Sequence, residues 1–218
     1  MTTIEELGRR AKQASRQMNR MGTTQKNQIL ALAAQALVDE QEEILKANAM
    51  DIKAAREKNM PEPMVDRLAL SESRIAGMAE GLTQLIALED PIGEIISSSI
   101  RPNGLEICKK RVPIGVIGII YESRPNVTAD AFGLCFKTNN TVILKGGSDA
   151  IESNKAIAKW LRTGLTRAGL PEDALQLIED TSRETTKELM RLNRYVDVLI
   201  PRGGAGLIRS VVENSTVP

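Results

Sequence analysis

The chain has 218 residues, of which 42% are hydrophobic, so it can bury a substantial core as one large domain or two small ones. A net charge of +1 and the lack of any apolar run near ~20 residues argue against nucleic-acid or membrane partners, and the polar N-terminus does not resemble a signal peptide, so we expect a soluble cytoplasmic protein. The absence of histidine removes the commonest general base and metal ligand, and two cysteines make neither a disulfide framework nor a structural zinc site.

Residues 3–92 show helical patterning. Thr3 and Glu6 form a capping box ahead of the first amphipathic stretch, and two further helical patterns follow it. The segment Met60–Pro63 breaks the pattern, and Ser71 then caps another helix that ends before residue 92. We therefore predict a helical N-terminal region whose charged residues form solvated faces.

A hairpin is predicted over residues 94–112. Two alternating segments, Glu94–Arg101 and Leu105–Val112, flank the dipeptide Asn103-Gly104, which is a strong signal for a tight turn between strands. Both arms are too polar for a core element. The hairpin either projects to pair with something outside the domain or is an ordinary surface ribbon.

A strand, a helix and a second strand are predicted next. Ile114–Tyr121 and Thr141–Lys145 are short apolar runs typical of buried strands, and Asn126–Thr138 between them has helical spacing. Asn139-Asn140 is a stop signal for that helix. A βαβ unit of this length predicts a parallel sheet.

The α/β alternation continues to the end of the chain. Ser148 is expected to cap a long helix, and strands are predicted at Leu175–Ile178 and Val196–Ile200 with a helix over Ser182–Leu192 between them. Residues 113–218 thus form a sheet with its helices. The predicted fold class is α/β, a Rossmann-like parallel sheet flanked by helices, with a helical N-terminus and a protruding β-hairpin.

Ligands bind at the carboxyl ends of strands in such sheets, which selects residues 121–126 and 146–148. A third candidate at this edge is the glycine-rich turn with Gly203, Gly204 and Gly206, because glycine before a helix lets backbone amides approach a phosphate. The spacing matches neither a G-x-G-x-x-G fingerprint nor a P-loop. Phosphate binding and a simple tight turn both remain open here.

Three motifs in order carry a family resemblance: RVPIGVIGIIYESRPNVTADAF, TVILKGGSDA, and IPRGGAGLI with VVENSTVP behind it. The chain resembles the N-terminal half of the γ-glutamyl phosphate reductase family, also called glutamate-5-semialdehyde dehydrogenase, within the aldehyde dehydrogenase superfamily. The resemblance implies that residues 1–218 are an NADP-binding domain, that the hairpin is an oligomerisation arm, and that the catalytic domain is absent from this chain.

The resemblance also implies a reaction in proline biosynthesis. Family members reduce L-glutamyl 5-phosphate with NADPH to glutamate semialdehyde and phosphate, after a cysteine thiolate displaces the phosphate. The family carries that cysteine beyond Pro218. Cys108 on the hairpin and Cys135 on an apolar helix stripe are not expected to replace it, because no evident basic neighbour lowers the pKa of either thiol.

The cofactor residues implied by the resemblance are Lys145, Gly146, Gly147 and Ser148, together with Gly203, Gly204 and Gly206. Lys145 would meet the adenosine ribose and its 2′-phosphate, and serine at 148, where NAD-preferring relatives often hold an acid, favours NADP. Gly146 and Gly147 would let the chain pass close to the adenosine, and the second glycine group would bring amides to the pyrophosphate. The alternative is a solvent-facing lysine and a helix-capping serine.

Three residues of the first loop are candidates for chemistry. Asn126 would stabilise an oxyanion by analogy with the superfamily asparagine, or would be only the N-cap of its helix. Arg124 would meet the acyl phosphate or a substrate carboxylate, or would be surface packing, and Glu122 shares its loop. No metal ligand is predicted.

Two functions of different class follow from these residues. The chain is the cofactor-binding half of a reductase that is inactive by itself, or it is a non-catalytic nucleotide-binding module. An aldehyde dehydrogenase relative that acts on an acyl-CoA is a third, weaker alternative. The resemblance further implies a homo-oligomer formed through residues 94–112 and association with a glutamate 5-kinase.

Overall fold

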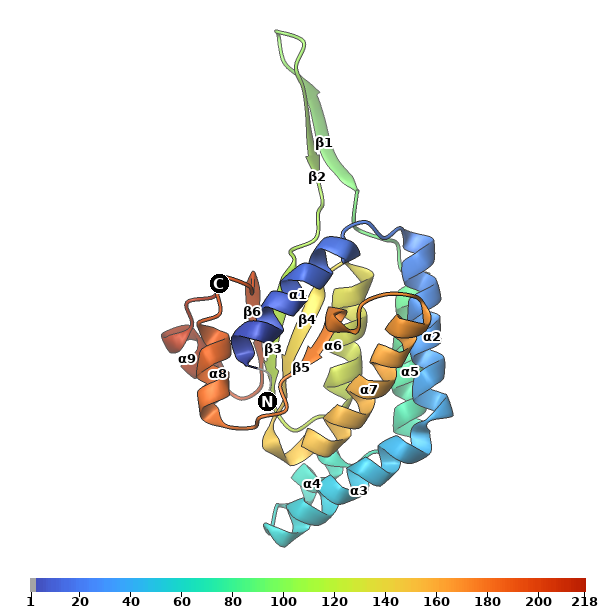
Figure 1. The fold of residues 1–218 in the computed structure, drawn as a ribbon, viewed down its shortest axis with the longest axis vertical. Coiled ribbons are helices and arrows are strands. Elements are labelled where there is room, and N and C mark those ends of the chain that lie inside the picture. Colours follow the sequence, from blue (N-terminus) through green and yellow to red (C-terminus); the bar gives the residue numbers. More distant parts are fainter. Residues whose placement is uncertain (1–2) are drawn as a thin grey trace.

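The computed structural model describes residues 3–218, which form a parallel sheet covered by helices on both faces and a long hairpin that leaves the body (Figure 1). The α/β fold class predicted from the sequence is confirmed. The elements in chain order are α1 (Ile4–Met18), α2 (Thr23–Asp39), α3 (Gln41–Glu57), α4 (Glu62–Leu68), α5 (Glu72–Ala87), β1 (Ile95–Ile100), β2 (Glu106–Lys110), β3 (Val116–Tyr121), α6 (Asn126–Lys137), β4 (Thr141–Lys145), a 3₁₀ turn (Ser148–Ala150), α7 (Ile151–Arg167), a second 3₁₀ turn (Glu172–Ala174), β5 (Leu175–Leu177), α8 (Arg183–Met190), β6 (Val198–Arg202) and α9 (Ala205–Asn214).

The sheet has the strand order β5-β4-β3-β6, and all its described pairings are parallel. β3 lies at the centre, with Ile117 opposite Val142 of β4 and Val198 of β6. Every residue of β3 and β4 is buried, as expected for strands covered on both faces. The carboxyl ends of these strands therefore meet at one edge.

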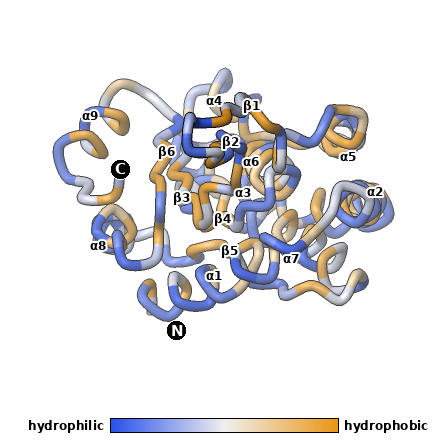
Figure 2. The backbone as a smooth tube through the Cα atoms, turned by 90° about the horizontal axis from the view of Figure 1, so that it is seen from above, coloured by the Kyte–Doolittle hydropathy of each residue, from blue (hydrophilic) through white to orange (hydrophobic). Residues whose placement is uncertain are grey.

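The sheet separates two hydrophobic cores, one on each of its faces. On one face α6 and α7 lie against the strands, and α2 and α5 pack outside them; Phe132, Phe136, Ile157 and Leu161 are buried there. On the other face α1, α8 and α9 cover a smaller core that includes Ile120 and Leu199. Figure 2 shows the strands between these helix groups, with α8 and α9 on one side and α2 and α5 on the other.

The helical N-terminus follows the predicted signals. The Thr3 hydroxyl accepts a hydrogen bond from the Glu6 amide at 3.2 Å, and Ser71 caps α5 in the same way through the Arg74 amide. Asn139 adopts a φ of 58° beyond the end of α6, which confirms the stop signal there. No helix among residues 3–218 combines the length and the apolar character that crossing a bilayer requires.

The hairpin of β1 and β2 is confirmed, and it projects from the end of the sheet opposite to the carboxyl edge (Figure 1). Gly104 has a φ of 84°, and its amide donates to the Arg101 carbonyl at 2.8 Å, so glycine is needed to close the turn. All residues of both strands are exposed, including Ile100 and Ile107. The arm thus contributes nothing to either core.

The sequence prediction missed α4. Met60–Pro63 was expected only to break the helical pattern, but a short helix begins at Glu62, directly after Pro61. Pro63 lies in the first turn of this helix, where proline is tolerated because the first amides of a helix have no partner within it. Val65 and Leu68 are buried by this helix, which lies at the carboxyl end of the sheet beside α3.

The predicted boundaries of the last strand were wrong. β6 covers Val198–Arg202 instead of Val196–Ile200, so Pro201 lies within a strand. The Leu199 amide donates to the Pro218 carbonyl at 2.7 Å and so points away from β3. Amides of a strand alternate in direction, so an amide at position 201, two residues further on, would also point away from β3. The missing amide of Pro201 therefore costs no hydrogen bond to β3. Proline is compatible with that side of the strand.

Candidate functional site at the carboxyl edge of the sheet

The predicted site residues meet at the carboxyl edge because β3, β4 and β6 end in register. Ile120 lies opposite both Lys145 and Pro201, and Tyr121 lies opposite Arg202. The segments that follow these strands, each running from a loop into the next helix or 3₁₀ turn, are Glu122–Asn126, Gly146–Ser148 and Gly203–Gly206. The fold thus brings together three segments that are far apart in the sequence.

Lys145 is the last residue of β4 and is only 4% exposed. Burial lowers the pKa of its ammonium group, while the negative charge of Asp180, beyond the end of β5, acts in the opposite direction. Within residues 3–218 the ammonium group forms no hydrogen bond or ion pair. A buried lysine without a partner is costly to fold, and an anionic ligand at this edge would compensate it.

Gly146 and Gly147 have packing reasons to be glycine. A Cβ at Gly146 would overlap the Asn154 amide and lie 3.2 Å from the Tyr121 ring, and one at Gly147 would lie 3.3 Å from the Ser123 hydroxyl. Tyr121, Thr128 and Asn154 form a buried hydrogen-bonded chain beneath this turn. The turn is therefore fixed by the core beneath it.

Ser148 does not cap the helix, which corrects the sequence prediction. It is exposed at the start of a 3₁₀ turn, and α7 begins only at Ile151 without a side-chain cap from its own N-terminal segment. Instead Asp51 of α3 accepts hydrogen bonds from the amides of Glu152 at 3.2 Å and Ser153 at 2.8 Å, and from the Ser153 hydroxyl at 2.5 Å. A carboxylate from another element thus meets this helix N-terminus.

Asp149 places an acid next to Ser148, but its carboxylate is engaged. It accepts a hydrogen bond from the Ser123 hydroxyl at 3.0 Å and lies 3.6 Å from the Lys58 ammonium group. These contacts connect the loop after β3 to the turn after β4. They also reduce the negative charge that Asp149 presents to a ligand beside Lys145.

The glycine turn after β6 is occupied by Glu122. The Gly204 amide donates to the Glu122 carboxylate at 3.0 Å, and a Cβ at Gly203 would lie 2.6 Å from the Glu122 carboxyl carbon. A Cβ at Gly206 would meet no heavy atom within 4 Å, so that position is open. The amide predicted to bind phosphate can hold an anionic oxygen, because a carboxylate oxygen already lies against it.

Asn126 is the first residue of α6, whose N-cap is Pro125, so the predicted alternative of a capping asparagine is wrong. Its side-chain amide donates to the Asp130 carboxylate at 3.1 Å. Burial raises the pKa of Asp130, and the charge of Arg202 opposes that shift. The asparagine lines a cavity of about 440 Å³ together with Arg67 and Arg124. Its role as an oxyanion donor stays a prediction.

Sequence reasoning selected Arg124 but missed two other arginines near it. Arg67 of α4 and Arg202 of β6 line a cavity of about 380 Å³ with Arg124 and Glu122. Arg67 was missed because its helix was not predicted. Arg202 was missed because it directly precedes the glycines, which drew the attention. A strand predicted to extend to residue 202 would have indicated that Arg202 lies at the carboxyl edge.

Neither cysteine is at the carboxyl edge. Cys135 is buried in α6, and burial raises the pKa of its thiol to about 12, which disfavours the reactive thiolate. Cys108 is exposed on the hairpin, 3.3 Å from the Ser98 hydroxyl. That neither thiol serves as the nucleophile stays a prediction.

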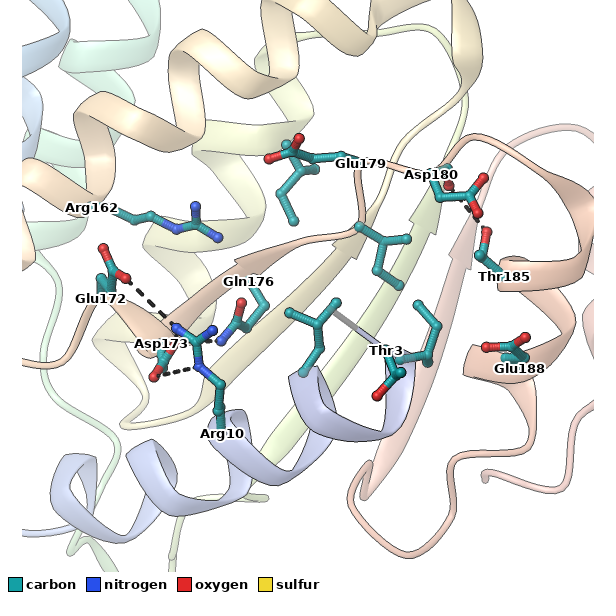
Figure 3. Close-up of a pocket in the computed structure, with 14 residues that line it drawn as sticks. Thr3, Arg10, Arg162, Glu172, Asp173, Gln176, Glu179, Asp180, Thr185 and Glu188 are labelled. Carbon is teal, nitrogen blue, oxygen red and sulfur yellow. Dashed lines mark hydrogen bonds and ion pairs between the residues drawn. The ribbon is translucent and has the colours of Figure 1, made fainter. Parts of the chain in front are cut away.

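A further cavity, of about 570 Å³, runs beside β5 between α1 and α8 (Figure 3). Arg10 of α1 is paired there with Asp173, through contacts of 3.1 and 2.5 Å. Carboxylates outnumber guanidinium groups along this cavity, and a dinucleotide phosphate would be repelled by them. Its acidic and basic lining residues are Glu172, Asp173, Glu179, Asp180, Glu188, Arg10 and Arg162.

Comparison with known proteins confirms the resemblance seen in the sequence. The chain is 56% identical over 215 residues to a gamma-glutamyl phosphate reductase of Moorella thermoacetica, covering 99% of this chain and 51% of the relative. It is 57% identical over 218 residues to the Clostridium beijerinckii protein of that name, covering 100% and 53%. The chain thus spans about half the length of the curated relatives it matches.

A solved structure supports the same relationship. The crystal structure of gamma-glutamyl phosphate reductase from Thermotoga maritima superposes with a TM-score of 0.96 at 45% identity, covering 98% of this chain and 51% of that one. The model of the Aldehyde dehydrogenase family matches residues 2–216. Since that match includes nearly every residue, this chain belongs to the aldehyde dehydrogenase family.

Proposed function

We propose that this chain is the cofactor-binding half of a γ-glutamyl phosphate reductase that uses NADPH. In the proposed reaction a hydride from NADPH and a proton reduce the acyl carbon of L-glutamyl 5-phosphate, and the bond from that carbon to the phosphate oxygen breaks. The products are L-glutamate 5-semialdehyde, NADP⁺ and inorganic phosphate. Such a reaction would belong to proline biosynthesis.

The observation that carries this proposal is the identity of 56–57% to two proteins named gamma-glutamyl phosphate reductase over essentially the whole chain. Fold alone would not suffice, because one fold hosts many activities. The residues at the carboxyl edge agree with the assignment, since they present a buried lysine and a backbone amide that can hold an anionic oxygen.

The residues present fit a dinucleotide phosphate. Lys145 offers a buried ammonium group at the end of β4 that has no partner within residues 3–218, which suits the 2′-phosphate of NADPH. The Gly204 amide at the start of α9 already holds a carboxylate oxygen at 3.0 Å, and a pyrophosphate oxygen would take that position. When bound, the cofactor supplies the hydride; Lys145 and the turn at Gly203–Gly206 position it.

The catalytic group that we propose on this chain is Asn126, at the start of α6. The Asn126 amide, which donates to Asp130 at 3.1 Å, would turn to the oxygen of the acyl group and stabilise its developing negative charge. A thiolate nucleophile would have to come from outside these residues, because Cys135 is buried and Cys108 lies on the hairpin. We therefore expect the 218 residues to bind NADPH without catalysing its oxidation.

The test uses the 218-residue chain and a titration with NADPH and with NADH, followed by Trp160 fluorescence or calorimetry. Lys145→Glu should weaken NADPH about 100-fold and NADH far less, because the change replaces a charged contact to the 2′-phosphate by repulsion. Lys187→Glu, on the exposed face of α8, is the matched control. Equal loss of both cofactors would contradict the 2′-phosphate role, and turnover by the chain alone would contradict its incomplete active site.

The pH dependence of NADPH binding supplies a second test of Lys145. Its ammonium group must be protonated to attract a phosphate, and burial lowers its pKa from 10.5. NADPH affinity should therefore fall as the pH rises through the lowered value, before an ordinary lysine loses its charge. Lys145→Arg should bind NADPH without that decline.

We further propose that the hairpin forms a homo-oligomer. Its exposed apolar residues and free strand edges support this, since an unpaired ribbon can add to a sheet of a second subunit. Replacing Ile100 and Ile107 by aspartate should lower the mass measured by light scattering, while the same change at Val212 of α9 should not. An unchanged mass would remove the hairpin from the interface.

A further inference from the structure

Arginine residues from three separate elements line one cavity at the carboxyl edge. Arg67 comes from α4, Arg124 from the loop after β3, and Arg202 from the end of β6. The cavity has a volume of about 380 Å³, and its walls include Tyr121, Val127 and the backbone at Gly203 and Gly204. It thus lies directly above β3 and β6, on the predicted ligand edge.

These guanidinium groups are poorly neutralised. Among residues 3–218 the side chains of Arg67 and Arg124 form no hydrogen bond or ion pair, and Arg202 reaches only Asp130, at 4.0 Å. The nearest carboxylate in the cavity, that of Glu122, already accepts the Gly204 amide. Like charges gathered around one space repel each other unless an anion lies between them.

We propose that Arg67, Arg124 and Arg202 bind the phosphate group of an acyl phosphate substrate. Arginine presents a planar set of donors that matches phosphate oxygens two at a time, and three such groups can surround a dianion. The same groups would stabilise the charge on the phosphate as it leaves the acyl carbon. This inference rests on the proposed function, because it names the part of that substrate which these residues would hold.

The position of Arg67 and Arg124 favours the substrate over the cofactor as the source of the phosphate. Gly203 and Gly204, the proposed contacts of the cofactor's pyrophosphate, line the cavity of about 380 Å³, but neither they nor Lys145 line the neighbouring cavity of about 440 Å³. Arg67 and Arg124 line both cavities, and the neighbouring cavity adds Asn126. A phosphate held by the arginines would therefore leave the adjoining acyl oxygen next to the predicted oxyanion amide.

The experiment titrates the 218-residue chain with inorganic phosphate, using calorimetry and NMR at constant ionic strength, with glutamate as the carboxylate comparison. Phosphate should bind and glutamate should bind far more weakly. Arg67→Gln and Arg124→Gln should each weaken phosphate about tenfold, and Arg124→Lys should recover part of the loss because it keeps the charge but not the paired donors. Arg167→Gln, at an exposed arginine in the last turn of α7, should change nothing.

A repeat of the titration at saturating NADPH decides between the two sources of phosphate. The substrate assignment predicts that phosphate affinity stays within about twofold, whereas competition between phosphate and NADPH would overturn it. Phosphate affinity that is the same in the Arg67→Gln, Arg124→Gln double variant would also overturn it. A chain that binds phosphate through these arginines but does not bind NADPH would contradict the proposed cofactor, not the arginine site.

Discussion

Two helices begin directly after turns at the carboxyl edge, and a carboxylate from elsewhere in the chain meets each of their N-termini. Asp51 meets α7, is 4% exposed, and accepts three hydrogen bonds from Glu152 and Ser153. Glu122 meets α9, is exposed, and accepts one hydrogen bond, from Gly204. Both arrangements place negative charge at the positive end of a helix dipole.

The difference lies in how readily each carboxylate can be exchanged. Removing Asp51 would leave buried donors without partners, so its place is closed to any ligand. Glu122 can turn into solvent, and an anionic group of a ligand can then take the Gly204 amide. The helix after β4 is therefore held by the protein itself, while the helix after β6 is available to a bound phosphate.

The largest expected effect is on the buried turn. Gly146→Val should lower the free energy of unfolding by about 3 kcal/mol, because its side chain would overlap Asn154 and crowd Tyr121. Urea denaturation followed by circular dichroism measures the change. Gly206→Ala, in the first turn of α9, is the comparison, and it should stabilise the chain by up to about 1 kcal/mol because no heavy atom lies within 4 Å of the added Cβ and alanine favours a helix. Equal losses of stability at both positions would show that the two glycines do not differ in packing.

Asp51→Ala should cost about 2 kcal/mol of stability, since it removes the cap of α7 and leaves buried donors of Ser153 unpaired. The same denaturation experiment measures it, with Asp39→Ala at the end of α2 as a control for loss of an acidic side chain. A change below about 0.5 kcal/mol would mean that solvent replaces Asp51 easily.

The contribution of Asp51 to stability should also depend on pH. Burial raises the pKa of the Asp51 carboxyl group above 3.8. The carboxyl group therefore stays protonated in the folded chain at a pH where it has already lost its proton in the unfolded chain. The stability that results is fully present below 3.8 and disappears as the pH rises through the raised pKa. Asp51→Asn cannot titrate, and the difference between its stability and that of the parent chain should change over this range. A constant difference would contradict the raised pKa.

The elements and site residues that depend on local sequence patterns could be predicted from the sequence. Buried apolar runs predicted β3 and β4, and the Asn103-Gly104 pair predicted the hairpin turn. The glycines after β4 and after β6 indicated two of the segments that form the site. The range of β6 and the existence of α4 were not predictable in this way, because Pro201 lies inside β6 and Pro63 inside the first turn of α4, at positions where no amide is needed.

The contacts that distinguish the two helix N-termini were invisible in the sequence for a different reason. Asp51 and Glu152 are 101 positions apart, and Glu122 and Gly204 are 82 apart, so no local motif connects either pair. Ser148 looked like the cap of α7 because serine often has that role, but a buried carboxylate from α3 took it instead. Likewise Arg67 joins Arg124 only through the packing of α4.

The smallest expected effect concerns Glu122, and it tests the exchange directly. Glu122→Gln keeps an oxygen for the Gly204 amide but removes the charge, so stability should change by less than about 0.5 kcal/mol. NADPH should bind about threefold more tightly, because its pyrophosphate no longer displaces or approaches a carboxylate. Glu213→Gln, near the other end of α9, removes the same charge at a distance and should leave the affinity unchanged. If both variants bind NADPH equally well, the gain reflects net charge, and the amide at Gly204 is not where the cofactor's phosphate lies.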